Sequence, residues 1–117
     1  MIIRRSALQP FDFNGLHVID YTSGCDTGSS LAVINVPPYG RHRQAWSKRS
    51  DKYYYVLAGT IQFTVNGEEH ELTAGDFCLI AQGQRFSYEN RASETAVLLL
   101  VHTPNFDLEA EVFIEEA

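Results

Sequence analysis

The sequence predicts an all-β fold in one domain, and three observations carry that prediction. Short runs rich in Val, Ile, Tyr, Phe and Thr recur at close spacing, with turn residues between them. No window shows a sustained apolar period of 3.6 residues, which an amphipathic helix would need. The dipeptide Asn66-Gly67 stands between two of the runs, and both residues tolerate the positive φ of a type I′ hairpin turn.

The expected strands follow from these runs in chain order. Two further turns, at Ala74-Gly75-Asp76 and Gln82-Gly83-Gln84, separate runs in the second half of the chain. The expected strands cover Leu16–Tyr21, Leu31–Val36, Arg41–Ser47, Lys52–Ala58, Thr60–Val65, Glu68–Leu72, Phe77–Ile80, Gln84–Glu89, Ala96–Thr103 and Glu111–Ile114.

Residues 1–29 are expected to form an edge strand and a loop that belong to the same domain as the barrel of residues 30–117. The loop is indicated by Thr22–Ser30, which is rich in Gly, Ser and Thr. An exposed strand edge is often protected by pairing with a second copy, and Tyr53, Tyr55 and Leu57 are expected to face outward. We therefore expect a homodimer of about twice 13.2 kDa, which sedimentation would measure.

Composition narrows the classes of function. A chain of 117 residues with 44% hydrophobic content is expected to form one domain. A net charge of -6 with only nine Lys and Arg argues against a nucleic-acid partner. The absence of a long apolar run argues against a membrane span or a signal peptide, so a cytoplasmic location is expected. Cys25 and Cys78 are expected to be free thiols.

Basic residues gather in one part of the chain, because five of the nine Lys and Arg fall between Arg41 and Lys52. Such a run is either a solvated loop or a positive patch that steers an anionic small molecule. A lysine that points into a barrel needs compensation, since an unpaired buried ammonium group is costly. It can reach the barrel mouth, pair with a carboxylate such as Asp51 or Glu89, or hold an anionic ligand.

Glycine spacing carries a further signal. Gly40, Gly59, Gly75, Gly83 and Asn90 stand at fixed intervals, and the run Tyr-Tyr-Tyr-Val-Leu-Ala leads into the second of these glycines. This frame resembles the two motifs of the cupin superfamily, G-(x)5-H-x-H-(x)3,4-E-(x)6-G and G-(x)5-P-x-G-(x)2-H-(x)3-N. The resemblance spans residues 30 to 106. It implies a double-stranded β-helix, or jelly-roll, barrel of the single-domain RmlC-like kind.

The metal-ligand positions of those motifs depart from the family. Where the family has His, His, Glu and His, this alignment places Trp46, Lys48, Lys52 and Phe86. Tryptophan offers only an N–H donor, phenylalanine offers nothing, and a lysine is protonated near its reference pKa of about 10.4. No metal and no cofactor are therefore expected. His42 and Asp51 are near misses that leave a displaced ligand set open.

Alternation along the strands groups the candidate site residues. If position 46 faces into the barrel, as the family's first ligand does, then Lys48, Lys52 and Tyr54 face the same way. Similarity to metal-free cupin epimerases implies His42 as base and Tyr54 as acid, and a deprotonated Lys52 could form a Schiff base. The remaining expected ligand-binding residues are Trp46, Lys48, Phe86, Tyr88 and His102.

Three functions are consistent with these residues. The first is a metal-independent cupin that binds a small polar or anionic metabolite, such as a carbohydrate or an organic acid, with isomerase or epimerase chemistry. The second is a non-catalytic small-molecule sensor or binding module. The third is a metal-dependent cupin oxygenase or isomerase with a displaced ligand set. The sequence leaves open whether the protein is an enzyme.

Overall fold

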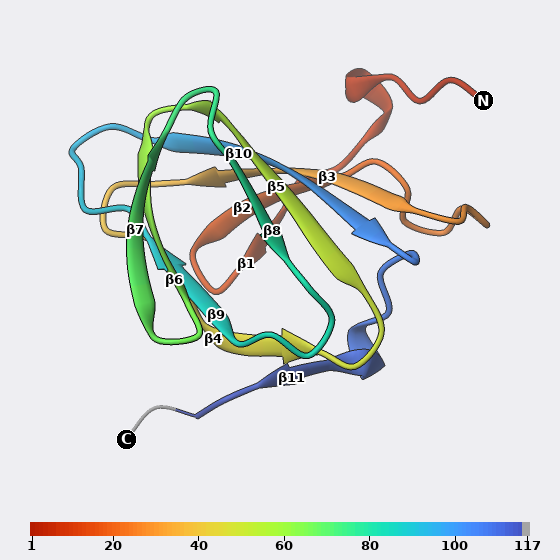
Figure 1. Cartoon of the computed structure of the whole chain (residues 1–117). Helices are drawn as coiled ribbons and strands as arrows, with labels where there is room; N and C mark the ends of the chain where they lie inside the picture. The colour runs from red at the N-terminus through yellow and green to blue at the C-terminus, as the bar shows by residue number, and fades with distance from the viewer. Residues whose placement is uncertain (116–117) are drawn as a thin grey trace.

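The computed structural model describes residues 1–115, and these residues form the expected all-β jelly roll (Figure 1). Two antiparallel sheets face each other, with strand orders β1-β2-β3-β10-β5-β8 and β11-β4-β9-β6-β7. The elements are the 3-10 turns η1 (Arg5–Ala7) and η2 (Leu108–Ala110) and the strands β1 (Phe11–Phe13), β2 (Leu16–Asp20), β3 (Ser30–Val36), β4 (Arg41–Ser47), β5 (Asp51–Ala58), β6 (Thr60–Val65), β7 (Glu68–Thr73), β8 (Phe77–Ile80), β9 (Phe86–Glu89), β10 (Ala96–Thr103) and β11 (Glu111–Phe113).

Turn chemistry fixes the connections between strands. Asn66 and Gly67 join β6 to β7 with φ values of 49° and 84°, as a type I′ hairpin requires. Gly59 joins β5 to β6 with a φ of 79°, and a Cβ there would lie 2.9 Å from the Cα of Ala96. No other residue type fits that position without moving β10.

The core lies between the two sheets, where alternate side chains of each strand meet. On β10 the even-numbered residues from Ala96 to His102 are buried, and the odd-numbered ones are partly exposed. The largest fully buried side chains include Tyr54, Phe63, Phe86 and Tyr88, which contact one another as rings 5.0 to 6.4 Å apart. An aromatic cluster therefore fills one part of the barrel.

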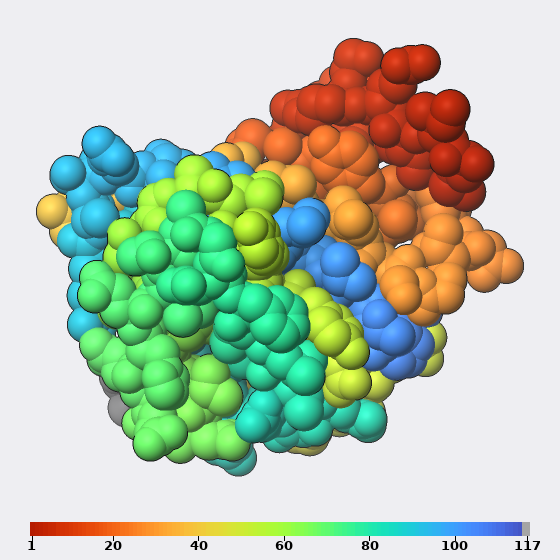
Figure 2. Space-filling view, turned by 45° about the horizontal axis from the view of Figure 1, so that its top comes forward, coloured from red at the N-terminus to blue at the C-terminus, as the bar shows by residue number. Residues whose placement is uncertain are grey.

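The outer face of the six-stranded sheet is apolar on β5 and β8. Tyr55, Leu57, Phe77 and Leu79 are 41% to 55% exposed. Both strands lie on the face turned to the viewer in Figure 2, and the N-terminal residues project from the barrel at one side of it. Among residues 1–115, no helix has the length and apolar character needed to cross a membrane.

Candidate functional site

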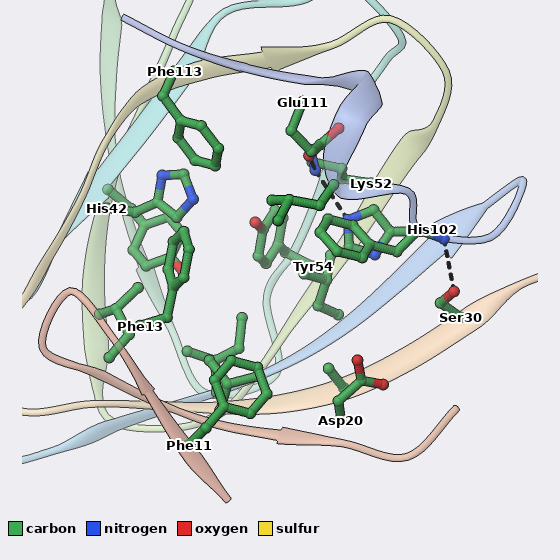
Figure 3. A pocket seen from close by; sticks show the side chains of 18 residues that line it. Phe11, Phe13, Asp20, Ser30, His42, Lys52, Tyr54, His102, Glu111 and Phe113 are labelled. Carbon is green, nitrogen blue, oxygen red and sulfur yellow. Dashed lines mark hydrogen bonds and ion pairs between the residues drawn. The ribbon is translucent and has the colours of Figure 1, made fainter. Parts of the chain in front are cut away.

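A cavity of about 220 Å³ opens into the barrel between the two sheets (Figure 3). Strands of both sheets line it, together with β1 and the segment from Phe106 to Phe113. Most of its wall is apolar, and the polar side chains in it are few. His42, Tyr54 and Tyr88 form one group, and Asp20, Ser30, Lys52, His102 and Glu111 are the others.

His42 lies on β4, directly opposite Tyr88 on β9. Its Nδ1 is 2.7 Å from the carbonyl oxygen of Arg43. Because a carbonyl oxygen only accepts hydrogen bonds, Nδ1 must carry the proton and Nε2 must keep its lone pair. Burial lowers the pKa of His42 to about 4, although the hydrogen bond to the backbone of Arg43 opposes this shift. The imidazole is therefore neutral at neutral pH, with Nε2 available as a base.

The two tyrosines beside His42 have buried hydroxyls. Their rings are 5.7 Å apart in an edge-on arrangement, and the Tyr88 ring lies 5.2 Å from the imidazole of His42. Burial raises the pKa of both Tyr54 and Tyr88, so both hydroxyls keep their protons. The Tyr54 hydroxyl is near enough to influence the pKa of Tyr88, yet the hydroxyl of Tyr88 has no well-formed hydrogen bond within residues 1–115. A buried polar group in this state favours a ligand that satisfies it.

Lys52 is the one lysine or arginine of the described chain that lines the cavity. Its ammonium group forms an ion pair with Glu111 of β11, and the two side chains are 5% and 6% exposed. It also donates to Nε2 of His102, 2.9 Å away, since an ammonium group cannot accept. Burial lowers the pKa of Lys52, and the Glu111 carboxylate opposes that shift. The partner is thus a carboxylate that sequence reasoning did not name, in place of Asp51 or Glu89.

His102 completes a polar row across the six-stranded sheet. It pairs in register with Ser30 on β3 and with Lys52 on β5. Burial, and next the positive charge of Lys52, lower the pKa of His102 to about 3. The residue is therefore a neutral hydrogen-bond acceptor that helps to hold the lysine in place.

These two histidines predict how stability depends on pH. In the unfolded chain each has a pKa near 6.5, whereas in the folded protein the values are about 4 for His42 and about 3 for His102. Below pH 6.5 the unfolded chain therefore binds more protons, and the free energy of unfolding should fall as the pH falls toward 4. Allowing for solvent screening, we expect a loss on the order of 2 kcal/mol. Urea unfolding at pH 7.5, 6.0 and 4.5 measures this loss. H42Q lacks one of the two histidines and should lose less stability over this pH range, so an equal loss in H42Q would contradict the low pKa of His42.

Not every expected site residue reaches the cavity. His42, Lys52, Tyr54, Tyr88 and His102 line it, and Phe86 is buried next to it, 5.1 Å from the imidazole of His42 and 5.7 Å from the Lys52 ammonium group.

Trp46 and Lys48 are elsewhere, and the expectation that they face inward is wrong. The pairing of β4 with β9 shifts between His42 and Ala45, so Ala45 and Ser47 take the buried positions. Trp46 is only partly buried and Lys48 is exposed.

The residues present do not fit the metal centre that the cupin motifs imply. The inward positions of the first motif are Ala45, Ser47 and Lys52, and Phe86 stands in the second motif. None of these side chains is a usual ligand for a divalent transition metal. Across residues 1–115 there is also no group of three or more His, Cys, Asp and Glu placed to hold a metal ion.

Among the residues of the cavity wall that sequence reasoning missed, four lie next to the polar groups or carry a charge. Phe13 and Phe113 flank His42, with ring centroids 6.1 and 6.0 Å from the imidazole. Glu111 and Asp20 supply the carboxylates. Asp20 could have been found, since it continues the alternation of Leu16 and Val18 along one strand. Glu111 could not have been found, because no sequence signal near it indicates that β11 lies against the cavity.

The comparisons with known proteins agree with this architecture. The sequence profile of the cupin domain matches residues 32–102, which is more than half of the chain. The protein belongs to the cupin family. This cupin is 31% identical over 78 residues to the tetracenomycin polyketide synthase protein TcmJ of Streptomyces glaucescens. The match covers 67% of this chain and 52% of TcmJ, so the chain spans about half the length of that relative.

Solved cupins share the fold at lower identity. Pac13 of Streptomyces, described as a nucleoside dehydratase, superposes with a TM-score of 0.86 at 19% identity, over 98% of this chain and 91% of Pac13. Its histidine-to-glutamine and tyrosine-to-phenylalanine variants have been solved with uridine. A predicted oxalate decarboxylase from Thermotoga maritima has a TM-score of 0.79 at 21% identity, over 89% of this chain and 99% of that protein.

Proposed function

We propose that this cupin is a metal-independent acid–base catalyst that removes water from a small, ring-bearing β-hydroxy carbonyl compound of the nucleoside or carbohydrate class. The observation that carries the proposal is a neutral His42 with a free Nε2 beside the unpaired hydroxyl of Tyr88, both on the wall of an aromatic cavity. A base next to a proton donor is the minimum equipment for elimination. A volume of about 220 Å³ suits a small metabolite.

The proposed reaction needs no external reagent. Nε2 of His42 removes the proton from the carbon next to the carbonyl group, and the C–H electrons form an enolate. The Lys52 ammonium group, kept protonated by Glu111, stabilises the enolate oxygen. The enolate then re-forms the carbonyl and expels the β-hydroxyl, which leaves as water with a proton from a tyrosine. The proton on His42 returns to that tyrosine, so the products are an unsaturated carbonyl compound and water.

The roles of Tyr54 and Lys52 follow from their surroundings. Tyr54 and Tyr88 both keep their protons. Tyr88, whose ring lies 5.2 Å from the imidazole of His42, supplies the proton for the leaving group, and Tyr54 packs edge-on against Tyr88 at 5.7 Å. Lys52 carries an ion pair with Glu111. A paired, protonated amine is a poor nucleophile, which favours an electrostatic role over Schiff-base formation.

Likeness to Pac13 supports the class of reaction and of ligand. Pac13 is described as a nucleoside dehydratase, and it shares the barrel along nearly all of this chain. At 19% identity that likeness is one of fold. The proposal therefore rests on His42 and the tyrosines, and Pac13 suggests which molecules to test first.

Turnover of oxidised nucleosides tests the proposal. Nucleoside aldehydes and ketones with a β-hydroxyl should lose water, which the ultraviolet absorbance of the conjugated product records. Activity should survive exhaustive chelation. Y88F lacks the hydroxyl that protonates the leaving group, so its activity should fall roughly 10-fold or more. Y88F should still bind the substrate. Y39F, at a tyrosine 76% exposed, is the matched control. Turnover that needs an added metal, or a fully active Y88F, would reject the proposal.

A non-catalytic binding module is the second candidate. One observation favours it: a histidine with a pKa of about 4 is a weak base at neutral pH. Such a module would bind nucleosides and show no exchange of carbon-bound protons with deuterated solvent, which nuclear magnetic resonance detects.

A further inference from the structure

We infer that Asp20 makes the cavity select uncharged, hydroxyl-bearing ligands and reject anionic ones. This inference rests on the proposed function, because it concerns the ligand of that same cavity. Of the polar and anionic ligands that the sequence left open, it favours the polar one.

The charges on the cavity wall do not favour an anion. Lys52 is neutralised by Glu111, and His42 and His102 are neutral at pH 7. Asp20 then remains, and Lys52 is the only lysine or arginine of residues 1–115 on the same wall. The described wall therefore carries a net negative charge.

The other basic residues of the run lie outside the cavity. Arg43 is exposed and stacks on the ring of Phe113, with its guanidinium carbon 4.8 Å from the ring centroid. Arg49 donates to the backbone and side-chain oxygens of Asn105 at 2.9 and 2.6 Å. Lys48 is exposed, and Arg41, also exposed, borders two further hollows beside His42 but is not on the cavity wall. The positive patch thus lies on the outer surface.

Asp20 is held in place at the end of β2. Its Oδ1 accepts a hydrogen bond of 3.1 Å from the backbone N–H of Thr22. The side chain is directed toward the interior of the cavity in Figure 3. One carboxylate oxygen is thus fixed by the chain, and the other can accept a hydrogen bond from a ligand hydroxyl.

Ser30 provides a donor at the same end of the cavity. Its Oγ accepts the backbone N–H of Phe106 at 2.7 Å, which leaves the hydroxyl proton free to donate. Ser30 is on β3, the strand that pairs with β2, and Asp20 lies opposite Ala32 on it. A carboxylate and a hydroxyl so placed can bind ligand hydroxyl groups, whereas a phosphate or carboxylate would meet the like charge of Asp20 in apolar surroundings.

Calorimetric titration with uridine and with uridine 5′-monophosphate tests the inference. The wild-type protein should bind uridine at least 10-fold more tightly than the monophosphate. In D20N the side-chain oxygen can still accept the hydrogen bond from Thr22, but the negative charge is removed. D20N should therefore bind the monophosphate more tightly, which reduces the preference for uridine roughly 10-fold. D26N removes the same charge from an exposed loop residue and should behave as wild type.

Each other outcome has a definite meaning. Equal binding of both compounds by the wild type, or an unchanged preference in D20N, would overturn the role of Asp20 and leave the proposed reaction standing. If the wild type prefers uridine but removes no water from the nucleoside aldehydes and ketones, only the proposed reaction is wrong. If neither compound binds to wild type or to D20N, both the selection and the proposed ligand class are wrong.

Discussion

Replacing His42 with glutamine should lower the turnover of any dehydrated substrate roughly 10²- to 10⁴-fold. Glutamine fills a similar volume and can still donate to the carbonyl oxygen of Arg43, but it offers no basic lone pair in place of Nε2. Binding should change little, because the ring packs among Phe13, Phe86 and Phe113 without charge. Steady-state kinetics should therefore show a loss in kcat with a nearly constant KM.

Two controls separate catalysis from folding. H17Q changes an exposed histidine on β2 that contacts Asn35, and it should keep full activity. The pH profile of wild-type kcat/KM should lose activity only as the pH falls toward about 4, because above that value His42 is already deprotonated. An acid limb near 6.5, or an active H42Q, would show that another group is the base.

Breaking the ion pair of Lys52 and Glu111 should have the largest effect on stability. In K52M the Glu111 carboxylate stays buried without its partner, and Nε2 of His102 loses its donor. Removing one member of a buried pair costs about 3–5 kcal/mol. For a domain of this size the melting temperature should fall by roughly 10 °C or more. Differential scanning calorimetry measures the change.

The double variant K52M/E111M distinguishes the effect of an unpaired buried charge from the effect of lost packing. Two apolar side chains of similar length leave no buried charge, so the double variant should recover much of the stability that K52M loses. K48M removes the same charge from an exposed site of the preceding turn and should change stability by less than about 0.5 kcal/mol. A double variant as unstable as K52M would contradict a role based on charge.

Most strands could be predicted because local chemistry decides them. The runs at Thr60–Val65, Phe77–Ile80 and Ala96–Thr103 have the expected boundaries, since turn residues or a proline limit them. β1 was missed, because Phe11–Phe13 is too short to show alternation. Its place is set by pairing with β2, a tertiary contact.

The candidate site could be predicted only where inward and outward side chains alternate regularly along a strand. Lys52 and Tyr54 face the cavity as alternation on β5 requires, and so does Tyr88 on β9. The shift on β4 reversed the faces beyond His42, and a spacing motif contains no sign of it. Glu111 was beyond reach for another reason, since the position of β11 depends on pairing with β4.

The cavity is enclosed by segments from opposite parts of the sequence. Phe11 and Phe13 of β1 and Glu111 and Phe113 of β11 stand on its wall, about a hundred residues apart in the chain. During synthesis the strands through β10 exist before the counter-ion of Lys52 does. The amine can therefore be enclosed at low cost only once β11 has paired with β4. The cavity is thus complete only after the last strand has paired, and a barrel without β11 lacks part of the cavity wall.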